Sequence, residues 1–516
     1  MQIASPVASQ FQPSPAVTGI RRRFTPSPVE LLCFALVLWL IGYTVAGGGT
    51  GLIRDSQTGY HIRIGEYVLQ HRAAPNTDFL SFTRPGESFF AWEWLTGVGT
   101  ALLYHWQGLR AIIVVSALLI GLTVLVMMRH MAWRGANVLI VVGLIHIAIG
   151  ASSIHYLARP HLFTLLFLAT ALWLLDKDRR HATLALWALV PLTALWVNLH
   201  GGFFGLLVTT GVLAGGSGIE WLLNRKPETL RYAIRYSLLT GVCFLASLVN
   251  PYGIREHIHL VDFLRETWYL TLTEEFQPPH LLSAAGIYHA LLFAGGVILA
   301  GVLLRRKRIA PALLILAWAF AACRSVRHVP IYAMVVLPWA AGELAVLWGR
   351  WTAGKSRASL AGILETMAAD YQPSLRRTSW FPSAAALLLL LFSFGLAYPA
   401  DFPESVYPVS LVARHSDDIA RARVFTTDGW GHYLTFRYPE PYRIFIDGRA
   451  DFFGERFTKE YLATLNGEPG WQDTFKRYRV EMALVPPEAP LATLLRSAPG
   501  WRLVEESSQA VLFSSL

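Results

Sequence analysis

Long apolar segments, separated by short polar connections, fill most of residues 31–399 of this chain. A bilayer core requires about 20 consecutive apolar residues per helix. On that scale the sequence predicts about eleven transmembrane helices, at 31–46, 109–128, 137–153, 161–175, 183–199, 203–223, 232–249, 287–304, 309–322, 329–348 and 381–398. With 54% hydrophobic and 15% charged residues, the fold class is a polytopic α-helical membrane protein and not a soluble one.

The net charge of +10 does not indicate nucleic-acid binding, because the basic residues fall in short clusters between apolar segments. Basic clusters in short loops mark the cytoplasmic side of a membrane protein. The clusters lie at 21–23, 129–134, 177–180, 225–231, 305–308 and 355–357, at alternate loops. We therefore predict a cytoplasmic N-terminus with a disordered leader at 1–30, a transmembrane domain at 31–399, and an outer face that includes the loops at 54–94 and 250–286.

The tail at 400–516 lies on the predicted outer face and has a different pattern. Short alternating segments at 442–446 and 482–485 predict strands, and the stretches between them are amphipathic. Trp471, Phe475 and Tyr478 recur at near-helical spacing, which is typical of a core. The tail is predicted to be a small extracytoplasmic α/β domain.

Unusual polar residues collect on this same predicted outer face, and ionisable groups at the ends of membrane helices mark functional sites. The candidate catalytic residues are Asp55, Glu93 and Glu275. The candidate substrate-binding residues are His61, Arg159, His161, Asn198, His200, Asn250, Tyr252, Arg324, Arg327 and His328. Because these residues gather on one face of the predicted membrane domain, we expect a pocket that opens outward.

The residue types indicate group transfer from a phosphate. Asp55 follows the first apolar segment, where a carboxylate can act as general base towards a hydroxyl or hold a metal. Arg159, Arg324 and Arg327 could bind an anion, because guanidinium pairs bidentately with phosphate. No Gly-rich nucleotide-binding loop is found.

Each residue also has a purely structural interpretation. Asp55 could pair with Arg54, and Glu93 could be an interfacial residue between two tryptophans. Residues 159–161 could simply start a helix, with the proline in its first turn. The sequences at 198–202 and 250–253 read as turns.

Several sequence patches resemble the GT-C superfamily of polyprenyl-phosphate-sugar-dependent glycosyltransferases, which includes protein O-mannosyltransferases, aminoarabinose transferases and oligosaccharyltransferases. The patches are DSQTGYHIRIG at 55–65, PNTDFLSFT at 75–83, WEWL at 92–95, ARPH at 158–161, WVNLHGG at 196–202, NPYG at 250–253, GHYL at 431–434 and FIDGR at 445–449. The patches are similar to those of a group of bacterial members, most of them uncharacterised. The resemblance implies an inner-membrane enzyme whose first outer loop carries the catalytic aspartate, here Asp55.

The resulting hypothesis is an inverting transfer of a sugar from a polyprenyl-phosphate donor to a hydroxyl on a glycan, lipid or protein at the outer face. Asp55 would be the base, and the arginines or His328 would stabilise the departing phosphate. The sequence establishes no cofactor and leaves a divalent metal open. The alternatives are a polysaccharide polymerase, ligase or transporter, and a non-catalytic scaffold.

Overall fold

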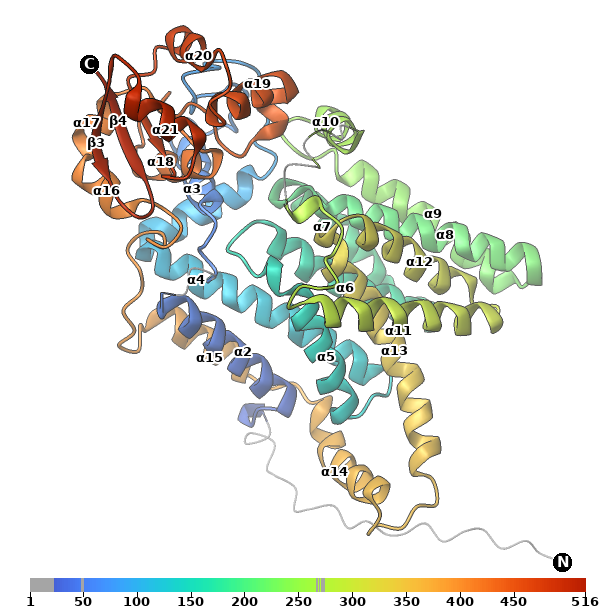
Figure 1. Cartoon of the computed structure of the whole chain (residues 1–516). Coiled ribbons are helices and arrows are strands. Elements are labelled where there is room, and N and C mark those ends of the chain that lie inside the picture. Colours follow the sequence, from blue (N-terminus) through green and yellow to red (C-terminus); the bar gives the residue numbers. More distant parts are fainter. Residues whose placement is uncertain (1–22, 48–50, 266–267, 269, 271–273) are drawn as a thin grey trace, which may run out of the picture.

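The computed structural model describes residues 23–47, 51–265, 268, 270 and 274–516, and it is predominantly helical (Figure 1). The α-helices are α2 (Pro28–Val45), α3 (Gln57–His71), α4 (Trp94–Trp133), α5 (Val138–Ser152), α6 (His161–Arg180), α7 (Leu189–Leu199), α8 (Phe204–Asn224), α9 (Pro227–Ala246), α10 (Ile254–Arg265), α11 (Gly286–Arg305), α12 (Ile309–Arg324), α13 (Val329–Thr352), α14 (Leu360–Leu375), α15 (Phe381–Leu391), α16 (Val409–Arg414), α17 (Ser416–Arg421), α18 (Asp428–Arg437), α19 (Ala450–Leu465), α20 (Trp471–Tyr478) and α21 (Pro490–Ser497). Short 3-10 helices are η1 (Ser153–His155), η2 (Leu184–Ala188), η3 (Gly201–Phe203), η5 (Glu274–Phe276) and η6 (Val326–His328). The strands are β1 (Val424–Thr426), β2 (Met482–Val485), β3 (Trp501–Glu506) and β4 (Val511–Ser515).

The first membrane helix, α2, begins earlier than the predicted 31. Ser27 caps it, since its side chain accepts from the Glu30 backbone N–H while the Glu30 carboxylate accepts from the Ser27 N–H. Pro28 then occupies the first turn, where its missing N–H costs nothing. The predicted leader at 1–30 therefore ends at this cap, and its residues 1–22 lie outside the described residues.

Six helical segments of the described chain are long and apolar enough to cross a membrane, and three shorter apolar helices accompany them. Large apolar side chains such as Trp39, Leu222, Ile298 and Phe320 are exposed on helix surfaces, as expected where lipid replaces water. A multi-pass membrane protein is thus supported. The number of about eleven spans and their orientation stay predictions.

The longest helix, α4, runs through the centre of the bundle, where it packs on α2, α3 and α6. It breaks at Gln107 and Gly108, and Gly108 has a φ of 62° that favours glycine. The predicted span at 109–128 starts directly after this break. The N-terminal part of α4 packs against α3, where Gly65 and Gly97 let the two backbones approach closely.

The C-terminal residues form the predicted α/β domain. Its sheet has the strand order β1-β2-β4-β3, with β1 parallel to β2 and the other pairs antiparallel. The strand predicted at 482–485 is confirmed as β2. The strand predicted at 442–446 is wrong, because only Ile444 pairs there, in isolated bridges to Ser81 and Val424. Trp471 and Phe475 are buried in this core, and Tyr478 packs against it.

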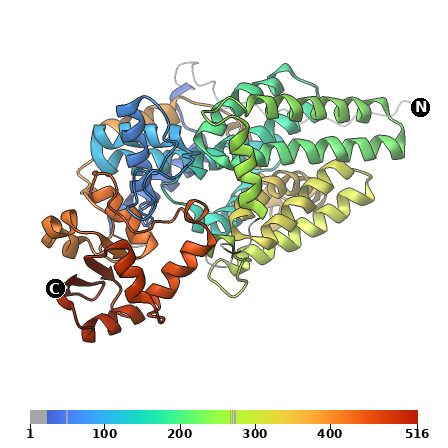
Figure 2. The same cartoon turned by 90° about the horizontal axis from the view of Figure 1, so that it is seen from above.

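This domain docks on residues 54–94, the segment predicted to be the first outer loop and called by that name below. The backbone of 442–444 hydrogen-bonds to Phe79, Leu80 and Phe82, and α18 packs against α3. Figure 2 shows the orange and red C-terminal residues beside the blue first-loop helices. The tail also reaches α10, where His259 Nε2 is 3.0 Å from Asp451 Oδ2 of α19. Loop and tail, far apart in sequence, therefore form one structural unit.

Candidate active site

Six of the predicted site residues come together where the first outer loop meets the starts of α4 and α6, the end of α7 and the short helix η5. We call these residues the polar cluster. They are Asp55, His61, Glu93, Arg159, His200 and Glu275.

Arg159 lies between two carboxylates of the cluster. Its Nη1 is 3.3 Å from Asp55 Oδ2, and its Nη2 is 3.4 Å from Glu275 Oε1. Burial opposes the charged form of the guanidinium, but Asp55 and Glu275 outweigh it and raise the Arg159 pKa. The sequence ARPH at 158–161 starts α6, as the structural interpretation predicted. It also places the Arg159 guanidinium between Asp55 and Glu275.

Asp55 is held on its other side by backbone. Its Oδ1 accepts from the Gln57 N–H at 2.8 Å, at the start of α3. The Tyr407 hydroxyl of the C-terminal domain donates to the Arg54 carbonyl at 2.9 Å and accepts from the Ser56 N–H at 2.7 Å. Both peptide units that flank Asp55 are therefore fixed by one tail residue.

Glu275 stays ionised although it is largely buried. Burial raises its pKa, but the nearby Arg159 and Arg327 guanidinium groups outweigh that effect and hold the pKa at about 2. The Ser325 hydroxyl donates to the Glu275 carbonyl at 2.8 Å, which fixes η5 to the end of α12. Arg327 lies over the Phe276 ring, 5.2 Å from its centroid.

Glu93 has a different environment, between two histidines. His61 Nε2 is 3.4 Å from one carboxylate oxygen, and His200 Nε2 is 3.4 Å from the other. Burial raises the pKa of Glu93 to about 7, and Arg159 and Arg327 offset this only in part. Burial also lowers the pKa values of His61 and His200 well below the usual range, so both imidazoles are neutral.

The orientation of His200 is set by a chain of hydrogen bonds. Its Nδ1 accepts from the Gly202 N–H at 2.9 Å and from the Thr164 hydroxyl at 2.8 Å, and Thr164 accepts from Trp196 Nε1. Since Nδ1 is an acceptor, Nε2 carries the proton and its N–H faces Glu93. The Glu93 side chain caps no backbone N–H at the start of α4, and is free to interact with both histidines or a ligand.

His161 lies close to the cluster, and its Nε2 is 2.6 Å from the His155 carbonyl. The ring of His328 lies near Trp318, with 6.0 Å between centroids. Arg324 ends α12 with an exposed side chain, and the structure does not bring it into the cluster.

The other predicted binding residues shape loops. Asn198 accepts from Trp94 Nε1 and donates to two backbone carbonyls. Asn250 donates to the Ser247 and Gly253 carbonyls and closes the turn that the sequence NPYG indicated. Tyr252 bridges the first outer loop, donating to Pro75 and accepting from Ala91.

A buried charge network between loop and tail was not predicted as part of the site. Arg449 Nη1 is 2.7 Å from Asp78 Oδ1, and its Nε is 2.8 Å from Asp447 Oδ1. His432 Nε2 is 4.0 Å from the same Asp447 oxygen, and its ring is 5.5 Å from that of Tyr60. The network thus reaches the residue preceding His61. Asp78 lies in the patch at 75–83 and Arg449 in the patch at 445–449, both of which resemble the GT-C superfamily. This resemblance was the only feature of the sequence that pointed to the network.

No group of three or more His, Cys, Asp or Glu side chains in the described ranges is arranged to hold a metal ion. The group that faces Asp55 and Glu275 is instead the Arg159 guanidinium. The cluster as described does not fit the divalent metal that the sequence left open.

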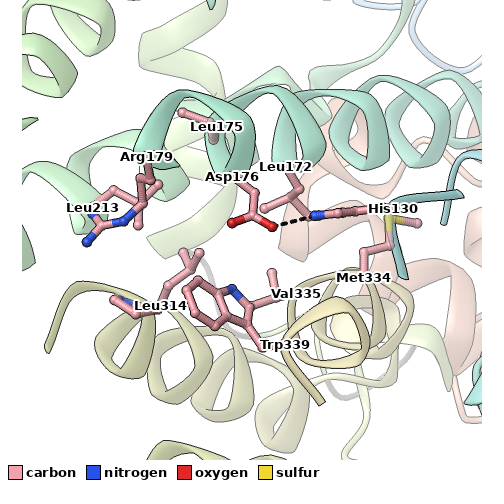
Figure 3. A pocket seen from close by; sticks show the side chains of 11 residues that line it. His130, Leu172, Leu175, Asp176, Arg179, Leu213, Leu314, Met334, Val335 and Trp339 are labelled. Carbon is pink, nitrogen blue, oxygen red and sulfur yellow. Dashed lines mark hydrogen bonds and ion pairs between the residues drawn. The ribbon is translucent and has the colours of Figure 1, made fainter. Parts of the chain in front are cut away.

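A second ionic cluster lies at the far end of α6, about 20 Å along the helix. His130 Nε2 is 2.8 Å from Asp176 Oδ2, and Arg134 Nη2 is 2.6 Å from Asp176 Oδ1. Figure 3 shows His130 and Asp176 at a cavity that Trp339 also lines. The cavity volume of ≈ 20 Å³ admits about one water molecule. This cluster joins helices and cannot hold a sugar.

Comparisons with known proteins show which solved structures have a similar fold. No protein-family model and no curated protein matches the chain. The oligosaccharyltransferase AglB from Archaeoglobus fulgidus, solved with an inhibitory peptide and a dolichol-phosphate, is similar with a TM-score of 0.54 at 12% identity, over 89% of this chain and 69% of that chain. The A. fulgidus oligosaccharyltransferase tethered to an acceptor peptide gives a TM-score of 0.51 at 13% identity over the same shares. ArnT from Cupriavidus metallidurans in the apo state gives 0.47 at 14% identity, over 94% of this chain and 98% of that chain. The resemblance to the GT-C superfamily is confirmed at the level of the fold.

Proposed function

We propose that the protein is a membrane glycosyltransferase that moves a sugar from a polyprenyl-phosphate donor to a hydroxyl acceptor at the outer face of the bacterial inner membrane. The observation that carries the proposal is the polar cluster, in which three carboxylates, the Arg159 guanidinium and two neutral imidazoles meet at one end of the helix bundle. The GT-C fold supports it, because solved neighbours with this fold include an enzyme bound to a dolichol-phosphate.

The proposed reaction is a single displacement with inversion. The acceptor oxygen forms a bond to the anomeric carbon while the bond from that carbon to the phosphate oxygen breaks. Asp55 takes the proton of the acceptor hydroxyl, and polyprenyl phosphate leaves with the electron pair. The Gln57 N–H and Arg159 hold the Asp55 carboxylate in place for this step.

The departing phosphate needs a cation, and we assign this role to Arg327. Arg159 already faces two carboxylates, whereas Arg327 makes no ion pair with any residue that the structure describes. Its charge lowers the pKa values of both Glu93 and Glu275, so it lies close enough to act on the same site. A preorganised cation at the leaving group stabilises the charge that develops in the transition state.

Glu93, His61 and His200 are proposed to orient the sugar. Both ring nitrogens of His61 are buried without a hydrogen-bond partner among the described residues. A buried unpaired nitrogen is costly, and a sugar hydroxyl would satisfy it. The neutral imidazoles and the Glu93 carboxyl together provide donors and acceptors for such hydroxyls.

The test is release of polyprenyl phosphate from a panel of polyprenyl-phosphate hexoses and pentoses by purified protein in lipid nanodiscs, with a cell-envelope extract as the source of acceptor. We expect turnover with at least one donor, and a loss of about 100-fold or more in Arg327→Gln. Arg456→Gln, an exposed arginine of α19, is the matched control. Absence of turnover with every donor in the presence of extract would overturn the proposal.

A further inference from the structure

A groove of ≈ 580 Å³ opens between the C-terminal end of α3, the loop that follows it, the start of α4 and the start of α10. Its volume lies within the range of known ligand pockets, roughly 300 to 1,000 Å³. The residues that line it include Val68, Arg72, Asn76, Trp94, Tyr252 and Arg255.

The groove is fixed to the cluster through its walls. Trp94 directly follows Glu93, and its indole N–H donates to Asn198 at 2.8 Å. The Tyr252 hydroxyl bridges the Pro75 carbonyl and the Ala91 N–H, at 2.7 and 3.0 Å. A ligand in the groove would therefore contact Trp94, the residue that follows Glu93 in the sequence, against walls that are already hydrogen-bonded in place.

The groove carries positive charge that the described protein does not neutralise. Arg72 and Arg255 are exposed and make no ion pair with any residue in the described ranges. The acidic neighbour Glu256 is buried, and burial together with Glu93 raises its pKa to about 8. Glu256 is thus largely uncharged at neutral pH, and two guanidinium groups dominate the groove.

The other lining groups suit a carbohydrate. Trp94 and Tyr252 offer aromatic faces, which pack against the C–H faces of sugar rings. Asn76 is exposed and provides an amide that can both donate and accept. Arginine pairs bidentately with carboxylate or phosphate, which gives the groove a preference for an anionic group.

We propose that this groove binds the acceptor, and that the acceptor is an acidic glycan carrying a carboxylate or a phosphate. The inference rests on the proposed glycosyltransferase function, which it deepens by naming the acceptor class. A neutral glycan leaves the two arginines unused, and the acidic peptide in the test below separates a sugar from a peptide of the same charge.

The test is binding of labelled oligosaccharides to the full-length protein in nanodiscs, without donor, at low and high salt. The probes are a trigalacturonate, a phosphorylated trisaccharide, a neutral galactotriose and an acidic hexapeptide. We expect an acidic trisaccharide to bind, its affinity to fall with salt, and Arg72→Gln and Arg255→Gln each to weaken it about 10-fold or more. The better of the two acidic sugars identifies carboxylate or phosphate as the anionic group. Arg456→Gln is the control, and equal thermal stability shows that each variant is folded.

Equal binding of the neutral sugar, stronger binding of the peptide, or no binding of either acidic sugar would overturn the inference. Because no donor is present, the result does not depend on turnover. Failure of the proposed function would appear instead as wild-type protein that binds the acidic sugar but cleaves no donor.

Discussion

Replacing Glu93 by glutamine should make the stability of the protein less dependent on pH. Burial raises the pKa of Glu93 from the usual 4.5 to about 7 in the folded protein. Between these values the folded state binds more protons than the unfolded state, so the contribution of Glu93 to stability is full below pH 4.5 and is lost as the pH rises through 7. Each pKa unit corresponds to about 1.4 kcal/mol, so the rise from 4.5 to about 7 gives an upper bound of about 3–4 kcal/mol.

The assay is thermal unfolding of the wild type and Glu93→Gln in one detergent at pH 5 and pH 8. Glutamine keeps the size of the side chain and cannot ionise, so the variant should gain stability relative to the wild type as the pH rises. Glu440→Gln, at an exposed position of the tail, should follow the wild type. Identical pH dependence in wild type and Glu93→Gln would refute the assignment of a raised pKa to Glu93.

Two further substitutions test the contacts that position the site. Arg449→Met removes the partner of two buried carboxylates and should cost about 3–5 kcal/mol, seen as a lower unfolding temperature and faster proteolysis within 400–516; unchanged protease sensitivity would contradict the docking role. In Gly65→Ala the new Cβ would lie 2.0 Å from the Gly97 carbonyl oxygen, whereas Gly99→Ala meets nothing within 4 Å. Gly65→Ala should therefore destabilise by at least about 1–3 kcal/mol, and equal unfolding temperatures of the two alanine variants would show that α3 and α4 do not pack this closely.

The sequence could predict the features that rest on local patterns. Apolar segments of sufficient length located most of the bundle helices, and the proline after Arg159 indicated where α6 begins. The rule that places basic clusters on one side grouped Asp55, Arg159 and Glu275 on the same face, and the structure brings these three side chains together. The predicted membrane side of each loop can thus indicate which polar residues belong to one site, even when the distances between them are unknown.

The remaining features depend on contacts between distant residues. Asp78 and Arg449 are 371 positions apart, and no periodicity relates them. The helix α3 within the first outer loop was not predicted, because its packing against α4 and α18 stabilises it rather than an apolar pattern of membrane length. The segment at 442–446 has a strand-like sequence, yet only Ile444 pairs, through one bridge to Ser81 of the first outer loop and one to Val424 of β1, so that no strand forms.

The central claim is that Asp55 takes the proton of the acceptor during transfer from a polyprenyl-phosphate sugar. The most direct measurement is release of polyprenyl phosphate by the wild type and Asp55→Asn, with the accepted donor and at matched thermal stability. Loss of a general base typically costs about 100-fold or more, so turnover should fall by at least that factor in the variant. Turnover that is unchanged in Asp55→Asn would contradict the claim.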